Sequence, residues 1–330
     1  MMMMTITDVK KTGIFRALQL GDMLCIVPAV RAFKNAYPTA ELTLIGLPWA
    51  ESFAKRFSHY FDKFIPFPGY PGLPEQEFKP AVFEQFSDEV KAEHFDLLLQ
   101  MQGNGTIVNP MLKTLGAKFM AGFDPAADRV TEQTRLLKYP NRGHEIDRNL
   151  ELMSFLGICA QDTALEFPIY EGDREELKEL NLPLTAERYI CIHPGSRGSW
   201  RQWPPLYFAS IANYCFSLGF DVVLTGTKDE LQIIRHVSSL MNKPPVIAAG
   251  KTSLGSLAVL ISESAAIICN CTGVSHMASA LNIPAVVISM DGEPWRWAPK
   301  DTEVQRCVDW TRNPDYHLVF KEVAALFFRI

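Results

Sequence analysis

The chain has 330 residues and a net charge of −5, with 48% hydrophobic and 21% charged residues. A single hydrophobic core rarely grows to serve this length, so we expect two domains. The mildly acidic balance, without a long lysine and arginine run, argues against a nucleic-acid partner. No segment reaches the roughly 20 apolar residues of a membrane span, and the N-terminal residues lack the apolar core of a signal peptide.

The cysteines are seven in number, and most lie within apolar segments. An odd number in such positions predicts reduced thiols in a cytoplasmic protein rather than a disulfide framework. Cys269 and Cys271 are separated by one residue, which is not a usual zinc spacing, and no second motif completes a site. We therefore expect no metal.

Short apolar segments alternate with helical patterns through the first half of the chain. Strands are expected at residues 13–18, 41–46, 62–67, 95–101 and 117–123, and helices at residues 23–37, 48–57 and 144–157. Pro28 fits the first of these helices only within its first turn or two, because proline has no N–H to donate.

The polar, proline-containing segment 169–188 is expected to connect two domains and to contain a short helix. After it the alternation restarts. We expect a strand and turn at residues 189–196, strands at residues 220–226, 265–270 and 284–289, and helices at residues 204–219, 228–241, 253–264, 273–282 and 317–330. Strands that alternate with helices predict parallel, doubly wound α/β sheets, whose ligands bind at the carboxyl ends of the strands.

Gly21 and Asp22 lie between the first expected strand and helix. Two interpretations of Asp22 are open. It caps the helix N-terminus, as aspartate often does, or it is a general base that deprotonates an attacking sugar hydroxyl. In the second case Gly21 lets an acceptor approach the backbone closely.

Two arginines follow the strand that opens the second half. Arg197 and Arg201 near a helix start indicate an anion site, in which Ser196 and Arg197 bind a diphosphate and Arg201 is a second clamp. The alternative is a surface turn with solvated arginines. Trp200 and Trp203 on either side favour the anion site.

Glu230 enters a helix after the next strand. A carboxylate there accepts hydrogen bonds from ribose hydroxyls in nucleotide-binding folds. The alternative is an acidic residue that complements the helix dipole, and both can hold together.

A strand ending at Asn270 is followed by a helix start rich in small polar residues. Free amides at Gly273, together with the Thr272 and Ser275 hydroxyls, would cradle phosphate without a metal, and His276 would add a hydrogen bond. The sequence contains neither a GxGxxG fingerprint nor a P-loop nor a GxSxG elbow, which argues against the corresponding dehydrogenase, ATPase and hydrolase classes.

An aromatic residue recurs every four positions at Trp49, Phe53, Phe57 and Phe61. Such a stripe suits peripheral contact with the inner membrane surface. It also suits packing of a helix into a core, which is the more frequent cause.

Three segments in this order resemble glycosyltransferase family 9, the ADP-heptose:lipopolysaccharide heptosyltransferases. They are residues 18–38, 191–205 and 270–288, and the resemblance spans residues 14–299. It implies a GT-B fold, in which two Rossmann-like domains face a cleft, and inverting transfer of a sugar from a nucleotide donor, typically an ADP-linked heptose, to a glycan or glycolipid acceptor.

By the same resemblance, Asp22 and Arg201 are the catalytic residues, with Asp22 as the base. The resemblance implies that Glu230, Thr272, Gly273 and His276 bind the donor. We also expect binding residues at Gly21, Ser196, Arg197, Thr252 and Cys271. Two positions depart from the family pattern, because Arg201 stands where lysine is usual and Cys271 where aspartate is usual. A thiol does not supply a charged acceptor for sugar hydroxyls at its ordinary pKa.

We therefore expect an acceptor domain at residues 1–168, a linker at 169–188, a nucleotide-sugar domain at 189–312, and a helix at 313–330 that packs back toward the first domain. No cofactor or metal is expected, and the enzyme would act in the cytoplasm, near the inner membrane surface. Three alternatives stay open: a transferase with a GDP- or UDP-hexose donor, a nucleotide-sugar epimerase of the same fold, and a catalytically silent nucleotide-binding protein.

Overall fold

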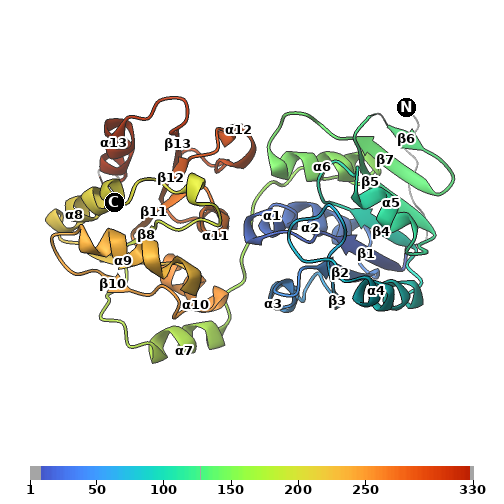
Figure 1. Cartoon of the computed structure of the whole chain (residues 1–330), viewed down its shortest axis with the longest axis horizontal. Helices are drawn as coiled ribbons and strands as arrows, with labels where there is room; N and C mark the ends of the chain where they lie inside the picture. Colours follow the sequence, from blue (N-terminus) through green and yellow to red (C-terminus); the bar gives the residue numbers. More distant parts are fainter. Residues whose placement is uncertain (1–8, 127, 328–330) are drawn as a thin grey trace. The chain divides into compact units, whose positions relative to one another are not determined.

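The computed structural model describes residues 9–126 and 128–327, which form two compact units that divide after Ala164 (Figure 1). The predicted linker is not a free connection. Its helix α7 (Glu171–Glu179) packs on α10 (Leu254–Ser262), and Glu176 accepts hydrogen bonds from Ser253 Oγ at 2.6 Å and Ser256 Oγ at 2.9 Å. Segment 169–188 contains the short helix that was predicted, but it belongs to the second unit and is not a separate linker.

The first unit contains a largely parallel sheet with the strand order β3-β2-β1-β4-β5-β7-β6 among the described residues. Only the hairpin partners β6 and β7 run antiparallel. The strands are β1 (Lys11–Phe15), β2 (Glu41–Gly46), β3 (Lys63–Pro66), β4 (Leu97–Gln100), β5 (Phe119–Asp124), β6 (Arg129–Val130) and β7 (Thr134–Lys138). The helices are α1 (Leu20–Leu24), α2 (Val27–Ala36), α3 (Ala50–Arg56), α4 (Pro80–Ala92), α5 (Val108–Lys113) and α6 (Glu145–Phe155).

The expected helix at residues 23–37 is two helices, α1 and α2. Pro28 lies in the first turn of α2, where its missing N–H is tolerated. The same missing donor cannot bond the carbonyl group of Leu24, at which α1 ends. The break therefore separates the short helix that carries Asp22 from the helix that packs on the sheet.

The second unit contains a parallel sheet with the order β10-β9-β8-β11-β12-β13, the strand order of a Rossmann fold. Its strands are β8 (Tyr189–His193), β9 (Asp221–Leu224), β10 (Val246–Ile247), β11 (Ala266–Asn270), β12 (Ala285–Ser289) and β13 (Gln305–Asp309). Its remaining helices are α8 (Pro205–Ser217), α9 (Leu231–Ser239), α11 (Gly273–Ala280), α12 (Pro294–Trp297) and α13 (Tyr316–Phe327), with 3₁₀ turns at Ser199–Arg201 and Lys228–Glu230. The predicted doubly wound α/β class is confirmed for both units.

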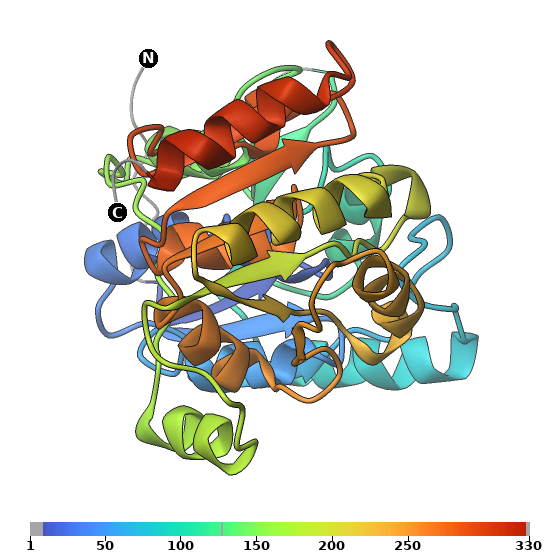
Figure 2. The same cartoon turned by 90° about the vertical axis from the view of Figure 1, so that its left-hand side faces the viewer.

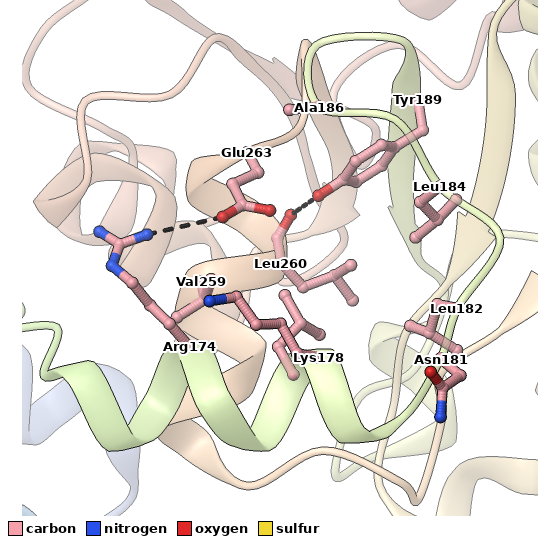
Figure 3. A pocket seen from close by; sticks show the side chains of 11 residues that line it. Arg174, Lys178, Asn181, Leu182, Leu184, Ala186, Tyr189, Val259, Leu260 and Glu263 are labelled. Carbon is pink, nitrogen blue, oxygen red and sulfur yellow. Dashed lines mark hydrogen bonds and ion pairs between the residues drawn. The ribbon is translucent and has the colours of Figure 1, made fainter.

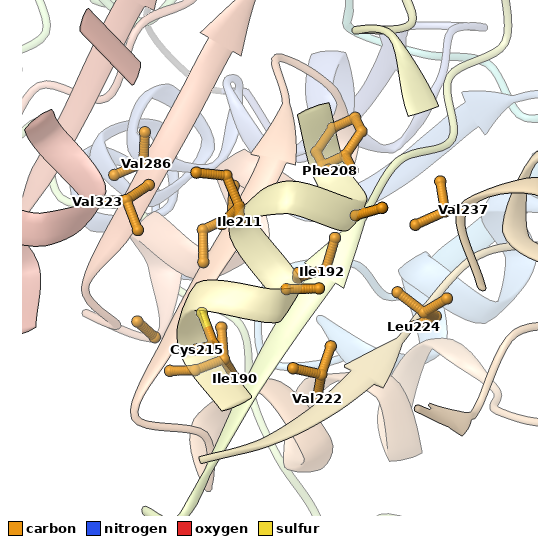
Figure 4. Close-up of a cluster of buried hydrophobic side chains, with 14 of the residues drawn as sticks. Ile190, Ile192, Phe208, Ile211, Cys215, Val222, Leu224, Val237, Val286 and Val323 are labelled. Carbon is orange, nitrogen blue, oxygen red and sulfur yellow. The ribbon is translucent and has the colours of Figure 1, made fainter. Parts of the chain in front are cut away.

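The core of the second unit lies between β8 and the helix that follows it. Ile190 and Ile192 are two positions apart in β8 and therefore share one face of the sheet. Figure 4 shows them beside Phe208 and Ile211 of α8, and all four side chains are fully buried. This packing fixes the position of β8, and with it the position of His193, from which the next loop begins.

The last helix packs on its own unit. Val319 and Val323 of α13 are fully buried in the core of the second unit, and the helix contacts α8, β12 and β13. Figure 2 shows α13, in red, lying along β13. We expected this helix to pack toward the first domain. Its apolar face is instead used to cover the second sheet, because that end of the sheet would otherwise expose its strands to water.

The aromatic stripe belongs to the interior of the first unit. Phe53, Phe57 and Phe61 are buried, and the rings of Phe53 and Phe57 stack with 4.4 Å between their centroids. The core interpretation is therefore confirmed at these three positions, and Trp49 is half-buried. Among the described residues, no helix has the length and apolar character needed to span a bilayer.

The core packing of α8 makes a direct prediction about stability. Phe208 is fully buried, whereas Leu206 on the same helix is 57% exposed. Phe208→Ala should lower the free energy of unfolding of the second unit by about 3–5 kcal/mol, because it removes buried contacts and leaves a cavity. Leu206→Ala, the matched control, should change it by less than about 0.5 kcal/mol. Urea unfolding curves measure both, and equal losses would contradict the packing described here.

Candidate active site

Six of the predicted donor-binding residues, together with Arg201, follow two neighbouring strands at the middle of the second sheet. β8 and β11 pair in parallel, with His193 opposite Cys269. The loops after these strands are those that contain Ser196 and Arg201 on one side and Cys271 to His276 on the other. This is the point where the strand order reverses, at which open α/β sheets bind their ligands.

A buried asparagine holds the two loops together. The Asn270 side-chain amide donates to the carbonyl oxygens of Pro194, at 2.8 Å, and Gly195, at 3.2 Å. Its Oδ1 accepts from the backbone N–H of Trp203 at 3.0 Å. One side chain from β11 thus fixes both ends of the segment that carries Ser196, Arg197 and Arg201. We did not single out Asn270 as a site residue, although its place at the end of a buried strand is a usable signal.

Glu230 lies against the backbone of the loop after β8. Its Oε2 accepts from the Thr227 N–H at 2.7 Å, as expected of an acidic residue at a helix start. The same oxygen is 3.8 Å from Nε2 of His193. A methyl group at Gly195 would overlap the Glu230 carboxylate, so a larger residue there would displace this side chain. Burial lowers the pKa of His193, against the opposing effect of the Glu230 charge, so the imidazole is held neutral.

Arg201 forms an ion pair with Asp291, which follows β12. The arginine is also stacked near the Trp200 ring, with 5.5 Å from its guanidinium carbon to the ring centroid. Burial by itself raises the pKa of Asp291, but the Arg201 charge and the hydrogen bonds to the carboxylate outweigh it and lower the pKa overall. Asp291 is therefore ionised at neutral pH. It was not among the predicted residues.

Cys271 is a buried neutral thiol. Burial raises its pKa, and the Asp291 charge raises it further. Its Sγ–H donates to the carbonyl oxygen of Trp297, at 3.8 Å. The Trp297 ring lies edge-on to the ring of His276, with 6.1 Å between centroids. The short helix α12 therefore covers the loop after β11, a contact that the sequence analysis missed.

The start of α11 has some of the features expected of a phosphate site. Thr272 is the N-cap residue, and its buried hydroxyl oxygen faces the backbone N–H of Ser275 in a capping-box arrangement. The Ser275 hydroxyl in turn donates to the Thr272 carbonyl oxygen at 2.7 Å and is engaged within the helix. The backbone N–H groups of the first turn, beginning at Gly273, point outward from the helix end. Arg197 is exposed and Thr252 is half-buried before α10.

In the first unit, Asp22 belongs to a network of charges after β1. Gln19 is the N-cap position of α1 and Asp22 lies in the first turn, so the interpretation of Asp22 as the cap was wrong. Its Oδ1 is 3.5 Å from Nη2 of Arg16, and its side chain is 26% exposed. The Arg16 guanidinium is buried and donates to Glu145 Oε1 at 3.0 Å and to the Met101 carbonyl oxygen.

The loop after β4 meets the loop after β1. The backbone N–H of Ala17 donates to Gln102 Oε1 at 2.6 Å, and Arg16 contacts Met101 as described above. β1 and β4 are the neighbouring strands at which the order of the first sheet reverses. Gly21 and Asp22 therefore lie at the switch point of the first unit, as the donor residues lie at that of the second.

A separate pocket of about 340 Å³ lies between α7 and α10 (Figure 3). Tyr189, at the start of β8, lines it and donates its hydroxyl group to the Leu260 carbonyl oxygen at 2.6 Å. Arg174 and Glu263 are 3.5 Å apart at its side. Because the pocket opens at the amino ends of the strands, it is distinct from the predicted donor site, and we assign it no role in donor binding.

Two Rossmann-like units, each with polar residues gathered at its switch point, define the GT-B class of glycosyltransferases. A solved structure of a family 9 glycosyltransferase from Veillonella parvula superposes with a TM-score of 0.82 over 98% of both chains, at 18% identity. The ADP-heptose lipopolysaccharide heptosyltransferase II of Escherichia coli gives a TM-score of 0.74, over 97% of this chain and 99% of that one, at 19% identity.

The sequence comparisons identify the family. The model of glycosyltransferase family 9 (heptosyltransferase) matches residues 84–320. The lipopolysaccharide core heptosyltransferase OpsX of Haemophilus influenzae is 24% identical over 88% of this chain and 82% of its own. The lipooligosaccharide heptosyltransferase 2 of Haemophilus ducreyi is 27% identical over 83% of this chain and 80% of its own. The chain belongs to glycosyltransferase family 9 and is a glycosyltransferase.

The hydrogen bonds of Asn270 lead to a testable prediction. Asn270→Ala leaves the Trp203 N–H and two carbonyl groups without this partner, and each unsatisfied buried group costs about 1–3 kcal/mol. We expect the free energy of unfolding to fall by at least about 2 kcal/mol and amide exchange at residues 194–203 to accelerate. Asn242→Ala, at an exposed position, is the control and should change neither. Unchanged exchange in the Asn270 variant would show that the loop is held by other contacts.

Proposed function

We propose that this glycosyltransferase moves heptose from ADP-heptose to a lipopolysaccharide-core or related surface-glycan acceptor, with inversion at the anomeric carbon. The names of the relatives, among them a lipopolysaccharide core heptosyltransferase, support the substrate class. We further propose that it acts in the cytoplasm, at the inner face of the membrane. Buried thiols such as Cys191 and Cys269 are compatible with a reducing compartment.

The proposed reaction is a direct displacement in which Asp22 is the general base. Its carboxylate removes the proton from an acceptor hydroxyl group, whose oxygen attacks the anomeric carbon of the donor. The bond from that carbon to the phosphate oxygen breaks, and the nucleoside diphosphate leaves. The observation that carries this role is the partly exposed carboxylate of Asp22, held at the end of β1 by the buried Arg16.

On the donor side, we propose that Arg201, Ser196 and the start of α11 stabilise the negative charge that develops on the leaving phosphate. The position of Thr272 as the N-cap of α11 and the first-turn amides support this assignment. Glu230 is proposed to accept from the ribose hydroxyls. These side chains and amides, rather than a metal ion, would meet the phosphate charge.

A donor with a different sugar or base is the second candidate, and Cys271 favours it. The family resemblance implies an aspartate at this position, and the structure has a buried neutral thiol there. A neutral thiol is a weak hydrogen-bond acceptor, so sugar hydroxyls that a carboxylate would bind are recognised less strongly. The change affects recognition of the donor sugar and leaves the proposed chemistry at Asp22 unaltered.

The role of Asp22 is tested by the substitution Asp22→Asn. The amide keeps the size of the side chain and cannot accept the proton, so we expect transfer to fall on the order of 10²- to 10⁴-fold. Donor binding should be unchanged, because Asp22 belongs to the other unit. Asp88→Asn on the exposed face of α4 is the matched control and should keep full activity. Full activity of Asp22→Asn would exclude Asp22 as the base.

The donor is identified by thermal unfolding in the presence of nucleotide sugars and EDTA. A ligand at 100 times its dissociation constant stabilises the folded state by about 2.7 kcal/mol, which raises Tm by roughly 5–10 °C for a domain of this size. We expect ADP-heptose to give this shift and GDP- and UDP-hexoses to give little. A larger shift with a GDP- or UDP-linked sugar would assign the second candidate instead.

A further inference from the structure

We propose that Asp291 is a positioning residue, whose carboxylate holds the Arg201 guanidinium in the orientation that binds the donor diphosphate. This inference rests on the proposed function for the part that Arg201 plays in donor binding. It adds Asp291, which follows β12, to the residues that follow β8 and β11. Neither the motifs nor the family resemblance indicated this residue.

The contact itself joins two loops of the second sheet. Arg201 ends the 3₁₀ turn after β8, and Asp291 follows β12. The Nη2 atom of Arg201 and Oδ2 of Asp291 form a hydrogen-bonded ion pair. The strand between them is β11, which ends at Asn270 and leads directly into the start of α11. The pair therefore spans the edge of the sheet beside the proposed phosphate site.

The aspartate is itself well fixed. Its side chain is only 8% exposed. Its second oxygen, Oδ1, accepts from Ser289 Oγ at 2.9 Å and from the Glu293 N–H at 3.2 Å. Ser289 is the last residue of β12 and is fully buried. Because both oxygens of the Asp291 carboxylate accept hydrogen bonds within the protein, the side chain is fixed in one orientation. It is therefore suited to hold Arg201 rather than to bind a sugar hydroxyl itself.

The arginine, by contrast, needs such an acceptor. Its side chain is 31% exposed, and Trp200, which stacks near it, is among the exposed aromatic residues. A free arginine side chain loses considerable rotamer entropy when a ligand orders it. Because a guanidinium has five N–H donors in one plane, an acceptor on one side orients the remaining donors toward a diphosphate. Asp291 therefore orients the Arg201 side chain before the donor binds.

A double-mutant cycle with Arg201→Ala and Asp291→Asn tests this coupling. Calorimetry on the full chain would measure the affinity for ADP and for inorganic pyrophosphate in the wild type, each single variant and the double variant. We expect Asp291→Asn to weaken binding on the order of tenfold. In the Arg201→Ala background the same change should alter affinity less than about twofold, because the residue that Asp291 orients is gone.

Asp309→Asn is the matched control. Asp309 ends β13, the next strand along the same edge, and its Oδ1 accepts from the Thr311 hydroxyl group at 2.7 Å. Its substitution should leave both affinities unchanged. Asp291→Glu keeps the charge with a longer side chain and should retain most of the affinity, in agreement with charge-dependent positioning. If Asp291→Asn does not fold, Asp291→Ser, which also removes the charge, replaces it in the cycle.

The outcomes separate this inference from the proposed function. An equal loss with and without Arg201, or no loss at all, overturns the positioning role while the transferase proposal stands. Binding of pyrophosphate but not of ADP rejects the proposed donor, and the cycle is then evaluated with pyrophosphate. If neither ligand binds the wild type, no diphosphate reaches Arg201 and both proposals fall.

Discussion

The loops at the switch point of the second sheet depend on the side-chain amide of Asn270. A parallel sheet ends in loops that have no hydrogen-bond partners of their own, so neighbouring loops diverge unless something ties them. Asn270 satisfies two carbonyl groups and one N–H of the loop after β8 from the end of β11. Since these groups are buried, losing the tie leaves them unpaired, which is the costly state for backbone polar groups.

In both units an arginine that follows a central strand is paired with acidic side chains. Arg16 is fully buried and is balanced by Glu145 and Asp22, and Arg201 is balanced by Asp291. A buried or half-buried cation without a carboxylate would be strongly unfavourable, so each arginine requires its acid. In each unit the arginine follows a central strand of the sheet, at the point where the strand order reverses. Structural need and the proposed chemistry therefore converge on the same residues.

The site motifs could be located from local pattern, but their partners could not. Asp22, Ser196, Glu230 and Thr272 each follow an apolar strand within a few residues, and parallel topology then brings strand ends together. Asp291 gave no such signal, because its role depends on a residue 90 positions earlier in the chain. Nor did the sequence distinguish the cap from the first turn at Asp22, since α1 is only five residues long and ends at Leu24, shortly before the break at Pro28.

By itself the sequence determined the alternation of buried strands with helices, and with it the two parallel α/β sheets. That information is local, because hydrophobic periodicity and proline position act within a single element. Tertiary structure decided which unit the segment 169–188 and the final helix belong to, and that the stripe at Phe53 and Phe57 is core. It also decided which acid meets Arg201. These outcomes depend on contacts between residues far apart in the chain. The hydrophobic or charge pattern of one segment does not specify which distant residue it contacts.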